Sequence, residues 1–94
     1  MSVTLQSRVR AADDVLFRNL EGEAVLVGLK TSCYFGLDPV GTRIWELLAQ
    51  HERLDAVLAG VVEEFEVDAA TAEADLLHLV GQLVAQGLVV VDPA

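Results

Sequence analysis

The stretch CYFGLDPVGTRIWELL, residues 33–48, changes its hydrophobic period in the middle and so constrains the fold strongly. Its first five residues are typical of a strand, whereas the apolar residues after Pro39 recur at helical spacing. Asp38 is suited to accept hydrogen bonds from the free N–H groups of a helix start, and Pro39 suits the first helical position. The stretch therefore predicts a strand, Cys33–Leu37, that leads directly into a helix from Pro39 to about Gln50.

Two further strands are predicted before this corner, at Val15–Leu20 and Glu23–Leu29. Glu21-Gly22 between them predicts a two-residue hairpin turn, in which Gly22 supplies the positive φ. Because the next connection, Lys30-Thr31-Ser32, is also short, consecutive strands are expected to pair. The result is a three-stranded antiparallel sheet whose third strand lies at an edge. Residues 1–12 are expected to form a loosely ordered arm or a short strand.

Two more helices are predicted in the second half of the chain. An apolar stripe at helical spacing runs through Leu54–Phe65. Asp68 is a suitable N-cap for a third helix, Ala69–Gln86, and Gly87 is a suitable residue to end it. The β-prone run at residues 88–91 predicts a short final strand or wing segment. The order of elements indicates an α+β domain.

The third helix has more apolar surface than one-sided packing needs. At helical spacing its apolar side chains cover an arc of about 160°, against a little over 100° for a helix packed on one side. Either the helix is wedged between two elements, or one flank of the arc lines a groove. The arc is formed by Ala72, Leu76, Leu77, Leu79, Val80, Leu83 and Val84.

Composition limits the class of protein. Ninety-four residues indicate one domain, 1–94, and a hydrophobic content of 53% argues against disorder. The formal net charge is −9, so the chain lacks the cationic surface from which most nucleic-acid affinity comes. No apolar run approaches the roughly 20 residues of a membrane span, and the N-terminus lacks a signal-peptide core. Cys33 is the single cysteine, so no internal disulfide forms. These features together predict a cytoplasmic protein.

Reaction chemistry is not indicated by any motif. Cys33, His51 and His78 lie far apart in sequence and have no neighbours at metal-ligand spacing. The glycines are scattered rather than grouped in a phosphate-binding loop, and no local motif joins a nucleophile to a base. We expect no enzyme activity, no metal and no cofactor.

Three segments carry a resemblance to a known family: DDVLFRNLEGEAVLVGL, YFGLDPVGTRIWELL and VDAATAEADLLHLVGQLVAQGLV. Over about residues 13–91 the chain resembles the PqqD family, small winged-helix domains that include the recognition elements for precursors of ribosomally made, post-translationally modified peptides. The most specific matches are Leu37-Asp38-Pro39, Gly41 and Ile44–Leu48. One departure is Thr31-Ser32, where the family often has a glycine before the third strand.

The resemblance implies a winged helix-turn-helix-like fold and a binding module without catalysis of its own. In such domains the leader segment of a precursor peptide adds as a further strand along the third strand, in the cleft beside the third helix. Carried over by position, the strand edge comprises Thr31, Ser32, Cys33, Tyr34 and Phe35. The apolar wall from the helix comprises Leu76, Leu77, Val80 and Val84, and Asp75 is placed to take a basic leader residue.

The implied partners are a precursor peptide and the enzymes that process it. A lasso-peptide leader peptidase and cyclase are favoured, and a radical modifying enzyme like that of pyrroloquinoline quinone synthesis comes next. One alternative is a winged-helix DNA-binding regulator, although the predicted third helix contains no Lys or Arg. The other is a homodimerisation module that uses the same edge strand, so the expected state is a monomer or a weak homodimer.

Overall fold

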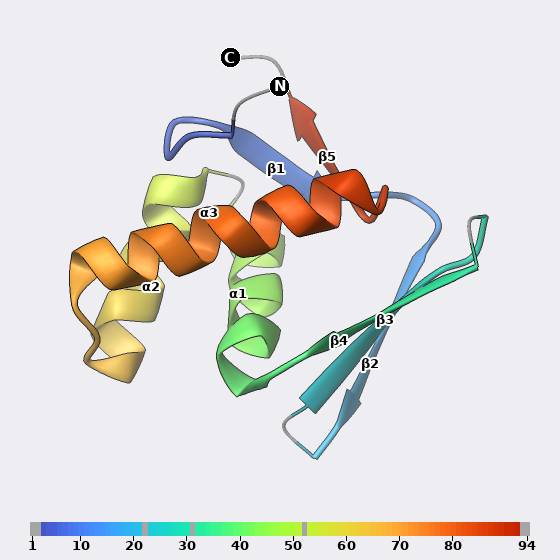
Figure 1. Cartoon of the computed structure of the whole chain (residues 1–94), viewed down its shortest axis with the longest axis horizontal. Coiled ribbons are helices and arrows are strands. Elements are labelled where there is room, and N and C mark those ends of the chain that lie inside the picture. The colour runs from blue at the N-terminus through green and yellow to red at the C-terminus, as the bar shows by residue number, and fades with distance from the viewer. Residues whose placement is uncertain (1–2, 22, 31, 52, 93–94) are drawn as a thin grey trace.

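The computed structural model describes residues 3–21, 23–30, 32–51 and 53–92 and has the α+β architecture that the sequence predicts (Figure 1). Its strands are β1 (Arg8–Ala11), β2 (Val15–Leu20), β3 (Glu23–Gly28), β4 (Cys33–Leu37) and β5 (Val89–Asp92). Its helices are α1 (Pro39–Gln50), α2 (Leu54–Phe65) and α3 (Ala69–Ala85). The bounds of β2–β5 and of the three helices agree with the sequence-based ones to within one residue.

Strands β2, β3 and β4 form the predicted antiparallel meander, in the order β2-β3-β4. Leu20 pairs with Glu23 across a two-residue turn, and Glu21 in that turn has a φ of 55°. This left-handed conformation is what a tight hairpin turn requires. The role predicted for Gly22 lies outside the described residues. At the next turn Ser32, where the family often has a glycine nearby, also has a positive φ, of 56°.

A second sheet joins the two ends of the chain. Strand β1 pairs antiparallel with β5, with Arg8 opposite Asp92 and Ala11 opposite Val89. The N-terminal arm thus contains a short strand, one of its two predicted forms, but the pairing with β5 was not predicted. Val9 in β1 is completely buried, so this sheet belongs to the core rather than to a loose arm.

The corner between β4 and α1 is held by one local hydrogen bond and by one that joins α1 to β3. Asp38 Oδ1 accepts a hydrogen bond from the Gly41 N–H at 2.7 Å, which confirms the predicted N-cap. A Cβ atom at position 41 would come within 3.1 Å of that carboxylate oxygen, so glycine lets the cap close tightly. The buried Thr42 hydroxyl accepts from the Ala24 N–H at 3.1 Å and ties α1 to β3.

Helix α3 crosses the core with caps at both ends. Asp68 Oδ2 accepts from the Thr71 N–H at 3.1 Å, and Gly87, with a φ of 73°, ends the helix as predicted. Its buried stripe contacts α2 and β5 and belongs to one core cluster that also includes buried residues of β1, β3, β4 and α1. The stripe consists of Ala72, Leu76, Val80 and Leu83. The helices lie on one side of the β2–β4 sheet (Figure 1), which leaves the other face of that sheet open.

Candidate functional site

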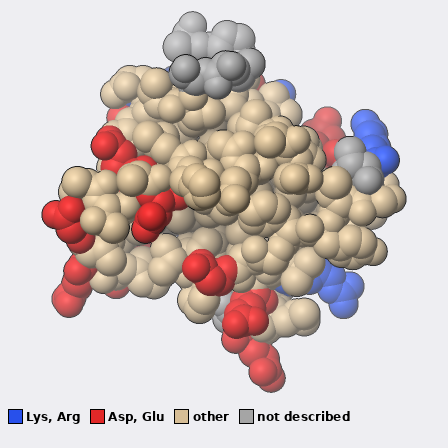
Figure 2. Space-filling view, viewed as in Figure 1, with Lys and Arg blue, Asp and Glu red and all other residues tan. Residues whose placement is uncertain are grey.

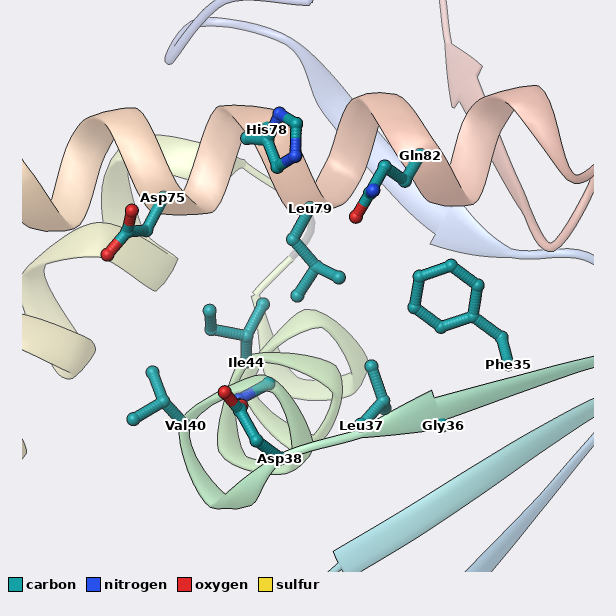
Figure 3. Close-up of a pocket in the computed structure, with 11 residues that line it drawn as sticks. Phe35, Gly36, Leu37, Asp38, Val40, Ile44, Asp75, His78, Leu79 and Gln82 are labelled. Carbon is teal, nitrogen blue, oxygen red and sulfur yellow. The ribbon is translucent and has the colours of Figure 1, made fainter.

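A groove of about 540 Å³ lies between β4 and α3, with α1 beneath it (Figure 3). Strand β4 and the corner after it contribute one wall, α3 contributes the other, and the first turns of α1 form the base. Its lining residues are Phe35, Gly36, Leu37, Asp38, Val40, Gly41, Ile44, Asp75, His78, Leu79 and Gln82.

The centre of the groove is apolar and its rim is polar. Leu79 points from α3 towards Ile44 on α1, and Phe35 rises from β4 towards α3 (Figure 3). Phe35 and Leu79 are only partly buried, so both rest against the core and also present surface. Asp75 and Gln82 flank Leu79 along the helix (Figure 3). An apolar floor with a few polar groups around it is typical of sites that fix a ligand in one orientation.

The open edge of β4 borders this groove. On one side β4 pairs with β3, with Phe35 opposite Leu26. On its other side, within the described part of the chain, no strand pairs with it. Such an edge carries unpaired N–H and C=O groups and is a ready template for another extended chain. The alternating side chains of β4 divide accordingly: Phe35 faces the helices and Tyr34 faces away.

The groove favours a neutral or cationic ligand. Its lining includes the carboxylates of Asp38 and Asp75 and no Lys or Arg. Asp38 is already engaged as the cap of α1, so the exposed Asp75 carboxylate is the freer of the two. In the face shown in Figure 2, acidic side chains lie at the end where α2 meets α3 and also along the lower edge, whereas most of the visible Lys and Arg lie on the right.

The structure brings part of the predicted site together. Phe35 and Asp75 both line the groove. Cys33 and Tyr34 lie on β4, and Ser32 comes just before it. The Cys33 Sγ donates to Oε1 of Gln86, the C-cap residue of α3, at 3.5 Å. Thr31 lies outside the described residues.

The predicted wall from α3 needs correction. Leu76 and Val80 have no exposed surface, so they belong to the core and offer nothing to a ligand in this structure. Leu77 and Val84 are partly buried and do not line the groove. Measured around the axis of α3 at about 100° per residue, Leu77 and Val84 lie about 80–100° to one side of Leu76. Leu79 and Asp75 lie about 60–100° to its other side, which is the side of the groove.

Three lining residues of α3 were missed by sequence reasoning: His78, Leu79 and Gln82. Leu79 was part of the apolar arc, but the arc has two flanks and its spacing does not say which one meets the core. The sequence carries no signal that singles out this flank, because one apolar residue beside Asp75, His78 and Gln82 is equally usual at the border of a solvated helix face.

The described residues contain no group of three or more His, Cys, Asp or Glu side chains that could hold a metal ion. Nor does that part of the chain include a helix long and apolar enough to cross a membrane.

Comparison with known proteins places the chain in a class. The family model described as coenzyme PQQ synthesis protein D (PqqD) matches residues 23–89, and the chain belongs to this family. A solved structure, "TbiB1 in Complex with the TbiA(beta) Leader Peptide", is similar to it with 36% sequence identity and a TM-score of 0.79. The match covers 85% of this chain and 93% of the TbiB1 chain. No curated protein matches the sequence.

Proposed function

We propose that this protein binds the leader segment of a ribosomally made precursor peptide as an added strand on β4. The observation that carries the proposal is the open edge of β4 beside an apolar groove. Support also comes from the similar TbiB1 structure, which was solved with a leader peptide. In this mode main-chain hydrogen bonds supply affinity, and pockets for alternate side chains supply specificity.

The groove gives the proposed peptide a defined chemistry. Every second side chain of an added strand points to the same face, so alternate peptide residues would enter the space between Phe35, Ile44 and Leu79. Apolar side chains suit that space. A Lys or Arg next to them would lie near Asp75, whose carboxylate is exposed at the rim.

The proposed role is recognition and delivery without catalysis. The domain would hold the leader while partner enzymes act on the rest of the precursor. A lasso-peptide leader peptidase and cyclase remain the favoured partners, and a radical modifying enzyme remains the second choice. The net charge of −9 and the absence of Lys and Arg from residues 69–85 disfavour a DNA-binding role.

An NMR titration tests the proposal. The ¹⁵N-labelled chain is titrated with the leader peptide encoded beside its own gene, and with the TbiA(beta) leader peptide as a heterologous probe. We expect shifts in the amides of residues 32–37 and of Leu79 and Gln82, whereas the amides of β1 and β5 stay in place. Binding of the cognate leader without shifts along β4 would contradict strand addition.

Size measurements separate peptide binding from self-association. If β4 instead pairs with a second copy of the chain, the apparent mass rises with concentration, and the peptide lowers it by competing for the same edge. If β4 is reserved for the peptide, the chain stays monomeric over the same range and gains only the mass of the peptide.

A further inference from the structure

The outer face of the β2–β4 sheet carries an uncovered apolar row. Leu16, Val27 and Tyr34 are cross-strand partners on three neighbouring strands, so their side chains lie in one line on the same face. Tyr34 is 76% exposed and Leu16 is 49% exposed, and Val27 between them is only partly buried. The helices pack against the opposite face (Figure 1).

Tyr34 is the last residue of this row, at the free edge of β4. The other outward residue of β4 is Gly36, which ends the neighbouring row from Arg18 and Val25. An ideal Cβ at Gly36 would meet nothing within 4 Å, so this position presents backbone alone. Any strand added beside β4 therefore meets one side chain of β4 on this face, the ring of Tyr34.

We infer that Tyr34 is a specificity-determining residue that packs against an apolar side chain on the outward face of the bound peptide. The inference rests on the proposed function, since it needs a peptide strand beside β4. The peptide residue opposite Tyr34 continues the row of Leu16 and Val27 into a fourth strand. Its neighbours in the peptide point the other way, into the groove.

The physical reason is the geometry of cross-strand pairs. Residues directly opposite each other in neighbouring strands hold their Cβ atoms about 4.5–5.5 Å apart, and pairs of an aromatic ring with another ring or with a β-branched side chain are among the favourable ones. A Tyr ring offers a large rigid surface at low entropic cost. Its exposure in the free protein means that this surface is available without rearrangement. The bound peptide would thus be contacted on both faces, by the groove on one side and by Tyr34 on the other.

The test uses peptides selected for binding to the wild-type chain. A phage library of random 14-residue peptides is selected on the immobilised wild-type chain. The best peptide is synthesised, and NMR checks that it shifts the β4 amides. Each of its positions is then replaced by alanine. The affinities of all these peptides are measured for wild type and for Tyr34→Ser, Tyr34→Phe and Leu16→Ser. Because Tyr34 and Leu16 are exposed, the variants are expected to fold as wild type, and circular dichroism checks this.

One peptide position is expected to couple to Tyr34. Its change to alanine weakens binding to wild type about three- to tenfold, as loss of an aromatic pair does, and leaves binding to Tyr34→Ser unchanged. Tyr34→Phe keeps the ring and retains the affinity. Leu16→Ser serves as the matched control, because it removes an apolar side chain from the same row two strands away, and it binds as wild type.

The possible failures are distinct. If peptides shift the β4 amides but Tyr34→Ser binds the whole alanine series as wild type does, the role of Tyr34 is overturned and the proposed function stands. If Leu16→Ser weakens binding as much as Tyr34→Ser, the effect belongs to the sheet as a whole, and the assignment to Tyr34 is overturned. If no selected peptide shifts the β4 amides, strand addition fails, and the inference fails with it.

Discussion

The two sheets of this small domain are built from similar strands and are used in opposite ways. Strands β1 and β5 join the two ends of the chain, with Val9 completely buried and Val89 almost so. Strands β2–β4 extend beyond the helices and carry most of the large exposed apolar residues, among them Leu16, Leu20 and Tyr34. The β1–β5 sheet covers part of the core, whereas the β2–β4 sheet has β4 as an open edge.

The difference teaches where this chain can tolerate change. A strand whose side chains enter the core is constrained by packing, because a protein interior is close-packed. A strand at an open edge keeps its pairing on one side and leaves its other side and outer face free. Mutations should therefore separate into those that change stability and those that change binding, and four predictions test this separation.

The largest expected effect is on stability, at the junction of α3 and β5. Leu88 is fully buried, and its carbonyl accepts a hydrogen bond from the Ala12 N–H at 3.0 Å. Leu88→Ala is expected to lower the free energy of unfolding by about 2–5 kcal/mol, as buried Leu→Ala changes do. Urea denaturation measures it. The matched control is Leu29→Ala, at an exposed position after β3, expected within about 0.5 kcal/mol of wild type. Equal costs would remove the distinction between the sheets.

The second effect is on binding, in the groove. Leu79→Ala removes three carbons from the apolar centre and is expected to lower the affinity for the leader peptide about tenfold. This loss is smaller than the roughly 0.8 kcal/mol for each fully buried CH₂ would give, because the side chain is only partly covered. Isothermal titration calorimetry measures the Kd. Leu77→Ala is the control, because Leu77 is also partly buried but lies on the other flank of α3. An unchanged Kd for Leu79→Ala would move the site away from this groove.

The third effect depends on charge. Asp75→Asn is expected to lower the affinity for a leader peptide that carries Lys or Arg about two- to fivefold at low salt. The effect is small because exposed ion pairs contribute little free energy. The loss should shrink in high salt because such pairs are screened. Glu73→Gln removes the same charge from the other flank of α3 and should bind nearly as wild type. If both variants lose affinity equally, the acidic surface acts as a general field and not through Asp75.

The smallest expected effect is a pH dependence of stability at the contact between α1 and α2. Arg43 Nε donates to Glu64 Oε2 at 2.8 Å, which joins α1 to α2 and holds the pKa of Glu64 below its ordinary value. Because the folded pKa is the lower one, this pair stabilises the fold above the ordinary Glu pKa of about 4.3, and the gain disappears as pH falls through the folded pKa. Urea midpoints of wild type and Glu64→Gln should therefore differ at pH 7 and converge as the pH falls below the ordinary Glu pKa and through the lower folded pKa of Glu64. Glu63→Gln removes the neighbouring carboxylate as the control; the same convergence there would disprove a role for this pair.

Features that depend on a few neighbouring residues were predictable from sequence. The cap at Asp38, the cap at Asp68 and the left-handed end at Gly87 each involve groups within about one helical turn. The change of period at residue 38 likewise places β4 and α1 next to each other. Each of these signals is read locally, so no knowledge of the tertiary structure is needed.

Features that depend on distant residues were not predictable in the same way. The pairing of β1 with β5 joins the two ends of the chain, and neither strand carries a local signal for the other. The rotation of α3 about its axis has the same character. Its arc of apolar residues has two flanks, and only packing against the other elements decides that Leu76 is buried and Leu79 faces the groove. The edge of β4 was predicted because a meander needs only short turns, whereas the helix wall was not.

The β1–β5 ladder also has a practical consequence for engineering. With Arg8 opposite Asp92, the first and the last described strands are neighbours, and neither strand contributes a residue to the groove lining. This proximity allows a circular permutant, in which a short linker connects β5 to β1 and new termini are opened between β2 and β3. Fluorescent reporters placed at those new termini would belong to the same sheet as β4, the strand to which the peptide is proposed to add.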